Sequence, residues 1–324
     1  MASANCRAIV CFTALTLLGF LFIYLTLNSG SVEISWADLG WRHVPYDNMK
    51  QRIFWEIRFP RMVAAILSGV ALAVSGLSLQ TLFRNPLAGP FVLGISSGAS
   101  FGVALSLLAG LSFGHFGVLG SAAVGALAVT ALIMWVSSRF ERSSILLIVG
   151  LLVGYFIDAL VSILVANSDA EALRVYVSWG MGSFGRLTFD GVLIFAGAIA
   201  LGLVMIVLSL KYLNAVRLGE DFARGLGVNI RRGRLFVLLG ASLLAAASTA
   251  YCGPVAFVGI AVPHLAFMLF KTSNHRVLLP GSALCGIVLC LAASLFSTVP
   301  LNAVLSIVGV PVILWVIIRG KGEH

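Results

Sequence analysis

The sequence predicts an all-α protein that crosses a membrane about ten times, with residues 1–324 forming a single transmembrane domain. Of the 324 residues, 60% are apolar and only 10% are charged, whereas a soluble domain carries about 25% charged residues. The mean hydropathy is +1.06, and apolar runs approaching the ~20 residues that a spanning helix needs recur along the whole chain. Because such a small number of charges cannot cover a water-exposed surface, most of the surface must face lipid.

Ten apolar runs are candidate spans. The first run could be a signal peptide, but its apolar core is long and no clear small-x-small cleavage site follows, so we predict a span. The seventh and eighth runs are separated only by Cys252, Gly253 and Pro254. The predicted spans are 8–28, 61–82, 91–109, 116–136, 145–166, 190–210, 234–252, 254–270, 277–297 and 303–318.

The distribution of cations predicts the orientation of the spans. With ten spans, alternate loops place 14 Lys and Arg residues on one side and 7 on the other, which accounts for all 21. The positive-inside rule makes the richer side cytoplasmic, so both termini are expected in the cytoplasm and residues 29–60 in an outer loop. The net charge of +9 therefore reflects cytoplasmic loops, and no nucleic-acid partner is expected.

Two arginines lie on the outer side, where cations are scarce. The segment "IRFPRM" places Arg58 and Arg61 directly before the second span. Such side chains can reach outward to lipid phosphates. They can also serve as a docking point for another protein.

The loop between the sixth and seventh spans predicts a short cytoplasmic helix. In "NAVRLGEDFARGLGVNIRRGR", residues 214–234, the apolar Leu218, Phe222 and Leu226 recur every four residues and share one face. Such a helix could lie on the lipid surface or dock into a groove of another protein. The acidic Glu220 and Asp221 in its first turn favour a protein partner.

Glycine and proline interrupt two spans. Residues 85–100 contain two prolines and three glycines, and residues 253–264 repeat the Gly-Pro pattern. Irregular backbone at membrane depth is found packed in protein or lining a wet cavity, and internal repeats are common in transporters. The candidate pathway lining is the small and polar set Ser75, Ser78, Gln80, Gly94, Ser96, Ser97, Gly98 and Ser100. The alternative is that these hydroxyls bond to backbone within their helices.

Asp158, within the fifth span, is the clearest ionisable group at membrane depth and a functional candidate by default. It supports an alternative class, a secondary transporter driven by an ion gradient. His264 is interpreted as a packed histidine, and the five cysteines form no metal-ligand spacing. The sequence contains no phosphate-binding loop, zinc-protease motif or serine elbow. We therefore predict no enzyme and no bound metal, with any energy supplied by a partner.

Four segments together resemble the permease subunits of bacterial type II ABC importers for cobalamin, ferric siderophores and haem, often called the FecCD type. They are "RFPRMVAAILSGVALAVSGLSLQTLFRNPLAGPFVLGISSGAS" (58–100), "LGEDFARGLGV" (218–228), "GPVAFVGIAVPHLAF" (253–267) and "VPLNAVLSIVGVPVILW" (299–315). The resemblance implies a bacterial inner-membrane protein that pairs with a second permease copy or a paralogue. It also implies two cytoplasmic ATPase subunits, which hold ATP and Mg²⁺, and a periplasmic binding protein. This chain is expected to bind no cofactor.

The resemblance also assigns residues. Arg58 and Arg61 match arginines that pair with acidic residues of the binding protein, and residues 214–230 match the segment that couples the permease to the ATPase. The coupling residues implied are Leu218, Gly219, Glu220, Asp221, Phe222, Ala223, Arg224, Gly225, Leu226 and Gly227.

The ninth span departs from the pattern of the family. Many members carry an Asp and an Arg before a Glu-Leu-Pro-x-Gly turn, where this chain has Ile287, Leu291, Thr298 and Asn302. Phe267 stands where the pattern "PHxAR" has its Arg. A heterodimer, in which a second permease supplies the missing groups, and a divergent subfamily with another ligand both fit these departures.

Overall fold

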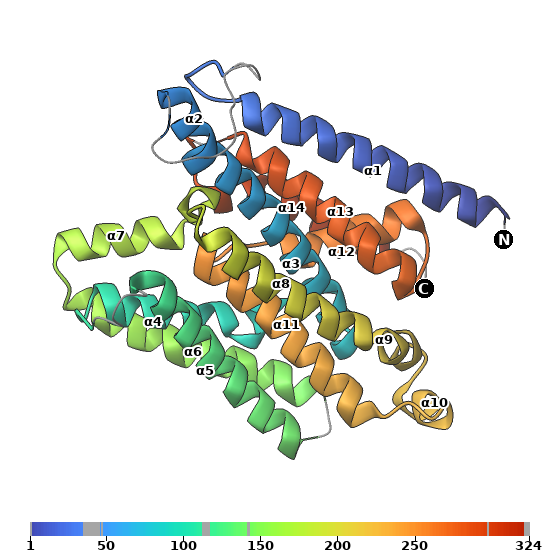
Figure 1. The fold of residues 1–324 in the computed structure, drawn as a ribbon. Coiled ribbons are helices and arrows are strands. Elements are labelled where there is room, and N and C mark those ends of the chain that lie inside the picture. The colour runs from blue at the N-terminus through green and yellow to red at the C-terminus, as the bar shows by residue number, and fades with distance from the viewer. Residues whose placement is uncertain are drawn as a thin grey trace.

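The computed structural model describes residues 2–34, 46, 48–111, 117–140, 143–296 and 298–320, and within these ranges all regular structure is helical (Figure 1). Each predicted span corresponds to one helix, so the predicted all-α fold is confirmed. Seven helices of the described part are long and apolar enough to cross a membrane, and three shorter apolar helices complete the set. The ten helices are α1 (Ala2–Asn28), α3 (Phe59–Phe83), α4 (Ile95–Leu107), α5 (Gly117–Arg139), α6 (Ser143–Ala166), α8 (Gly191–Leu208), α11 (Ile230–Cys252), α12 (Val258–Phe270), α13 (His275–Ser294) and α14 (Leu301–Gly320).

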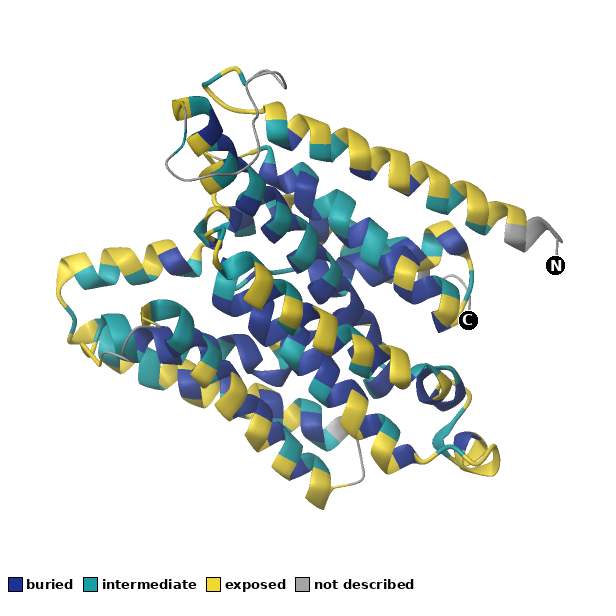
Figure 2. Ribbon diagram, viewed as in Figure 1, coloured by how far each residue is buried: buried dark blue, intermediate teal, exposed yellow. Residues whose placement is uncertain are grey.

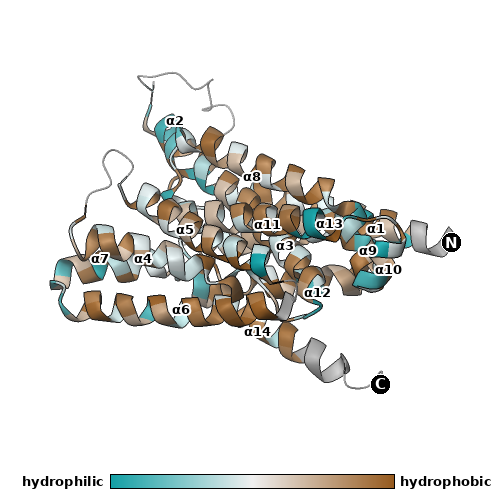
Figure 3. Ribbon diagram, turned by 90° about the horizontal axis from the view of Figure 1, so that it is seen from below, coloured by the Kyte–Doolittle hydropathy of each residue, from teal (hydrophilic) through white to brown (hydrophobic). Residues whose placement is uncertain are grey.

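Shorter elements lie at the two ends of the bundle. The start of α1 and the end of α14 lie at the same end as the short helices α9 and α10, and α2 and α7 lie at the opposite end (Figure 1). Figure 3 shows hydrophilic residues gathered at these ends and hydrophobic residues along the helices between them. The short elements are α2 (Met49–Ile53), the π-helix η2 (Phe54–Arg58), the 3₁₀-helices η3 (Pro90–Leu93) and η5 (Phe184–Arg186), α7 (Ala170–Gly180), α9 (Leu210–Val216) and α10 (Glu220–Gly225).

The second half of the outer loop predicted over residues 29–60 is helical. The helix that contains α3 begins at Met49, because α2 and η2 continue into it without a break. Asn48 caps this start, and its side-chain oxygen accepts a hydrogen bond from the Gln51 amide at 2.8 Å. The remainder of this predicted loop that falls on residues 35–45 and 47 lies outside the described residues.

Helix α3 is the centre of the bundle. Its span is 78% buried, whereas the spans of α1 and α6 are 11% and 17% buried. Figure 2 shows this contrast between a buried centre and exposed outer helices. An apolar helix surface that nothing in the chain covers must face lipid or another subunit.

Small residues let the central helices approach closely. A Cβ on Gly69 of α3 would collide with the backbone of Gly286 in α13, and a Cβ on Gly76 would overlap the carbonyl oxygen of Gly259 in α12. Lipid gives little hydrophobic drive for helix association, so close backbone packing has to supply much of it. Helices α4 and α5 meet in the same way, at Gly98 and Gly125.

The two Gly-Pro breaks contact each other. Helix α3 is followed by an irregular segment and the 13-residue α4, and α11 is followed by an irregular segment and the 13-residue α12. A Cβ added to Gly259 would lie 3.0 Å from Pro90, and the Gln80 amide donates a hydrogen bond to the Ile260 carbonyl at 3.1 Å. The same order of elements in both halves supports the predicted repeat.

Arginine side chains bind the C-terminal ends of helices. Arg7 donates to the carbonyl of Leu269 in the last turn of α12, and Arg186 donates to the carbonyl of Trp179 in the last turn of α7. Arg84 binds the end of α9 in the same way. The last carbonyls of a helix have no hydrogen-bond donor within the helix, and the negative end of the helix dipole lies at them. An arginine that bonds to them supplies the missing donor and also places a positive charge at that negative end.

Candidate functional site

Helix α10 presents an uncovered apolar surface at the end of the molecule that also holds the ends of α1 and α14. Leu218, Phe222 and Leu226 are 69%, 50% and 61% exposed. These are the three residues whose spacing predicts one face. Phe222 lies on α10, and Leu218 and Leu226 lie just before and just after it. Exposed apolar side chains gathered in this way are typical of a surface that binds a protein or a membrane.

The opposite side of α10 is fixed to the bundle. Ala223 is fully buried, and its carbonyl accepts a hydrogen bond from the Val228 amide. Glu220, the first residue of the helix, pairs with Arg234 of α11 at 3.0 Å, and Arg234 is only 6% exposed. The pair therefore joins α10 to a helix that packs on α3, α5 and α8.

The phenol of Tyr212 lies beside this ion pair. Burial raises the pKa of Tyr212 to about 12, and the positive charge of Arg234 works against that rise. Its ring also blocks any side chain larger than glycine at position 233. The ion pair is therefore held in a closely packed corner formed by α9, α10 and α11.

Arg58 and Arg61 both bond to helix ends at the end of the bundle that holds α2. Arg58 is 6% exposed and donates to the carbonyls of Leu27 and Val32, at and after the end of α1. Arg61 donates to the carbonyl of Ser294, the last residue of α13, at 2.7 Å. Both arginines line one pocket of about 250 Å³. The buried Arg58 does not reach toward lipid, which corrects the snorkelling alternative for that residue.

The structure separates the predicted lining residues into two groups. Ser75 and Ser78 are fully buried, and their hydroxyls donate to the carbonyls of Ala241 and Val74. Ser78 bonds within its own helix, as the backbone-bonding alternative predicts, whereas Ser75 bonds across to α11, and neither hydroxyl faces a pathway in this structure. Gly94, Ser96 and Gly98 are also packed inside, and Gln80 bonds to Ile260. The partly exposed members of the set are Gln80, Ser97 and Ser100.

A polar group of side chains lies on α4, α6 and α7. Asp158 is exposed in the middle of α6, on a surface that also carries Tyr155, whose side chain is 70% exposed. Burial raises the pKa of Tyr176 on α7, a hydrogen bond with Ser100 lowers it, and the charge of Asp158 raises it. Ser100 of α4 and Asp158 of α6 therefore lie near Tyr176 of α7. Sequence reasoning missed Tyr176, because nothing in the pattern of α7 points to a site.

The departures in and after the ninth span have structural roles. Leu291 is fully buried and Ile287 is partly buried, so both positions of α13 face packed surroundings. The Asn302 side chain donates to the carbonyls of Gly180 and Pro254 and accepts a hydrogen bond from the Ala256 amide.

Asn302 thereby joins the end of α7, the break before α12 and the start of α14. Nothing in its sequence context indicated this function. Thr298 and Phe267 are exposed, and His264 donates from Nδ1 to the Ile260 carbonyl at 2.8 Å, which confirms its interpretation as a packed histidine.

Two spans are broken by glycine and proline around the central helix α3. The polar Asp158 is exposed on α6, and the short helix α10 is left uncovered at one end of the bundle. These features are typical of a multi-pass transport permease. The model of the FecCD transport family matches residues 16–319, and the chain belongs to that family. It is 36% identical to the hemin transport system permease protein HmuU of Yersinia pestis, over 95% of this chain and 97% of that one.

Two further comparisons agree. The chain is 35% identical to the vitamin B12 import system permease protein BtuC of Vibrio cholerae, over 85% of each chain. A solved ABC transporter described as of the metal-chelate type, in an inward-facing conformation, superimposes with a TM-score of 0.83 at 30% identity, over 96% of this chain and 99% of that one. The predicted family and the type II importer permease fold are thus confirmed.

Proposed function

We propose that this chain is the permease subunit of an ATP-driven importer for a large metal chelate, an iron–siderophore or a related haem or cobalamin. Two copies, or this chain and a paralogue, form the translocation pathway in the bacterial inner membrane. Relatives named as hemin and vitamin B12 permeases support this class of cargo. The excess of cations in alternate loops supports a cytoplasmic location for both termini.

The main support for this proposal is the exposed face of α6. Asp158 and Tyr155 are exposed near the middle of a 24-residue apolar helix, and Ser162 is exposed one turn closer to its C-terminal end. A carboxylate facing lipid at that depth costs several kcal/mol, about 2.5–3.5 kcal/mol at the least on insertion scales. A second permease packed beside α6, with a water-filled pathway between the two, removes this cost. Ser97 and Ser100 extend the same polar lining onto α4.

In this proposal, the ATPase subunits drive transport through their contact with α10. Two ATPase subunits bind the cytoplasmic face, and each receives one α10 in a cleft that covers Leu218, Phe222 and Leu226. ATP and Mg²⁺ bind to those subunits, and this chain performs no chemistry. Closure of the ATPase pair moves α10, and the ion pair between Glu220 and Arg234 transmits that movement to α11.

The second candidate function, an ion-driven secondary transporter, rests on Asp158 alone. Asp158→Asn distinguishes the two. In proteoliposomes that hold the permease with its ATPase, we expect uptake to require ATP, to be insensitive to an ionophore, and to keep at least about half its rate in the variant, since a neutral amide preserves a polar lining. The measurement is uptake of the labelled chelate. Uptake that follows an ion gradient without ATP and disappears in Asp158→Asn would instead establish the secondary transporter.

The outer pocket is the proposed contact for the periplasmic binding protein. An acidic side chain entering it meets Arg58 and Arg61 together, and the planar guanidinium suits a carboxylate. Arg61→Gln keeps an amide donor for Ser294 and removes the charge. We expect affinity for the binding protein at low salt to fall about tenfold and its salt dependence to flatten.

Surface plasmon resonance over a salt series, with the permease in nanodiscs, measures this effect. Arg174→Gln, which removes a different exposed charge from the same outer end, is the matched control. Equal affinity of the Arg61 variant and the parent, with unchanged thermal stability, would limit both arginines to capping helix ends.

A further inference from the structure

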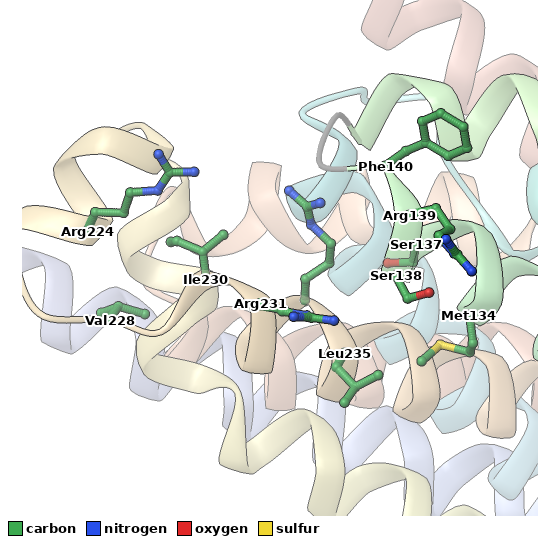
Figure 4. Close-up of a pocket in the computed structure, with 11 residues that line it drawn as sticks. Met134, Ser137, Ser138, Arg139, Phe140, Arg224, Val228, Ile230, Arg231 and Leu235 are labelled. Carbon is green, nitrogen blue, oxygen red and sulfur yellow. The ribbon is translucent and has the colours of Figure 1, made fainter.

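A cavity of about 470 Å³ opens between the end of α5 and the α10–α11 segment (Figure 4). Side chains of α5 line it on one side, and side chains of α10 and α11 line it on the other. Its size lies in the range of ordinary ligand pockets. The proposed lining of the transport pathway does not include it, since that lining lies on α4 and α6.

Four arginines line this cavity, and no acidic side chain does among the residues that the structure describes. Arg224 lies 3.7 Å from Asp221, and Arg234 is engaged by Glu220. Arg139 and Arg231 are exposed, and neither has an ion-pair partner within the described ranges. Two positive charges are therefore left to attract an anion.

A helix start at this place also favours an anionic group with oxygen acceptors. The 23-residue helix α11 begins at Ile230, which also lines the cavity, so the positive end of its dipole lies there. Guanidinium groups at a helix N-terminus suit a phosphate group.

The rim of the cavity has the character of a membrane surface. Trp135 and Phe140 of the α5 end are 58% and 46% exposed, and exposed aromatic residues gather at the level of lipid headgroups. The Arg139 guanidinium lies 6.0 Å from the centre of the Trp135 ring. Val124, Leu132 and Trp135 are exposed on one face of α5, which offers an apolar track for an acyl chain leading away from the cavity.

We propose that this cavity binds the phosphate headgroup of an anionic phospholipid, with Arg139 and Arg231 as the principal contacts. The lipid joins the end of α5 to the base of the coupling segment. A bound lipid at this place stiffens the connection between α10 and the bundle, so the lipid composition of the membrane influences coupling.

Native mass spectrometry of the full-length protein tests the proposal, with phosphatidylglycerol and phosphatidylcholine titrated as competing probes. We expect the parent to prefer phosphatidylglycerol, and Arg139→Gln combined with Arg231→Gln to lose about thirtyfold in affinity for it. The matched control is Lys211→Gln combined with Arg276→Gln, which removes two cations from a separate cavity beside α9 and is expected to keep the preference.

An unchanged preference in the Arg139/Arg231 variant, or an equal loss in the control, overturns the proposal. A second measurement separates a lipid from a free anion. Hydrogen exchange of residues 134–140 and 224–235 is compared in phosphatidylcholine nanodiscs with excess inorganic phosphate and in nanodiscs that contain phosphatidylglycerol. Protection by phosphatidylglycerol alone supports the lipid, and equal protection by inorganic phosphate shows a site for free anions.

Discussion

Phe222→Asp is expected to leave the permease folded and to remove its ATPase partner. Half of the Phe222 side chain is exposed in the free chain, so the change disturbs little of the packed interior. In the complex the same position lies in an apolar cleft, where a charge loses its hydration without gaining a partner. Loss of a central aromatic anchor costs about 2 kcal/mol or more, which is about thirtyfold in affinity.

Native mass spectrometry after gentle extraction measures this result. We expect the parent to appear as two permeases with two ATPases, and the variant as permeases without ATPase and without ATP-driven uptake. Phe222→Leu is the control, because it keeps an apolar side chain and should retain the assembly. A complete four-subunit particle with full uptake in Phe222→Asp would show that α10 is not the coupling element.

Gly76→Leu is expected to be the most damaging single substitution in the bundle. Position 76 lies where α3 crosses α12, and any Cβ there overlaps the carbonyl oxygen of Gly259. The conflict is with backbone, so no side-chain rotation relieves it, and the two helices must separate. We expect a loss of about 3 kcal/mol or more in the free energy of unfolding, seen as a lower midpoint of thermal denaturation and poor recovery from the membrane.

Gly197→Leu is the matched control for this prediction. Gly197 lies in the exposed α8, and a Cβ there meets nothing within 4 Å. The same change of residue then adds the same side chain to a lipid-facing surface. Similar midpoints for both variants would mean that close packing of α3 on α12 contributes little to stability.

The local sequence pattern determined much of the secondary structure of this molecule. All ten spans and the amphipathic helix at α10 follow from apolar runs and their spacing, because a bilayer imposes length and composition on each span independently of its neighbours. The Gly-Pro breaks were also evident, since proline and glycine act on the backbone of their own segment. The family followed from motifs that occur in order along the chain.

The roles of individual polar residues depended on tertiary contacts. Ser75, Ser78 and Ser100 are the same residue type on neighbouring segments, yet two bond to backbone inside the bundle and one faces the α6–α7 surface. In the sequence, Asn302 is only a departure from the family pattern. In the structure, its side chain joins three segments by hydrogen bonds.

The outer arginines show the same division. Their sequence position indicated the outer side of the membrane, but only the structure shows that Arg58 and Arg61 bond to the ends of α1 and α13. The sequence by itself determined which segments cross the membrane and which helix extends from it, because these depend on each segment's own contact with lipid or water. Only the tertiary structure decided which carbonyls each polar side chain satisfies, because those partners lie up to 262 residues away in the chain.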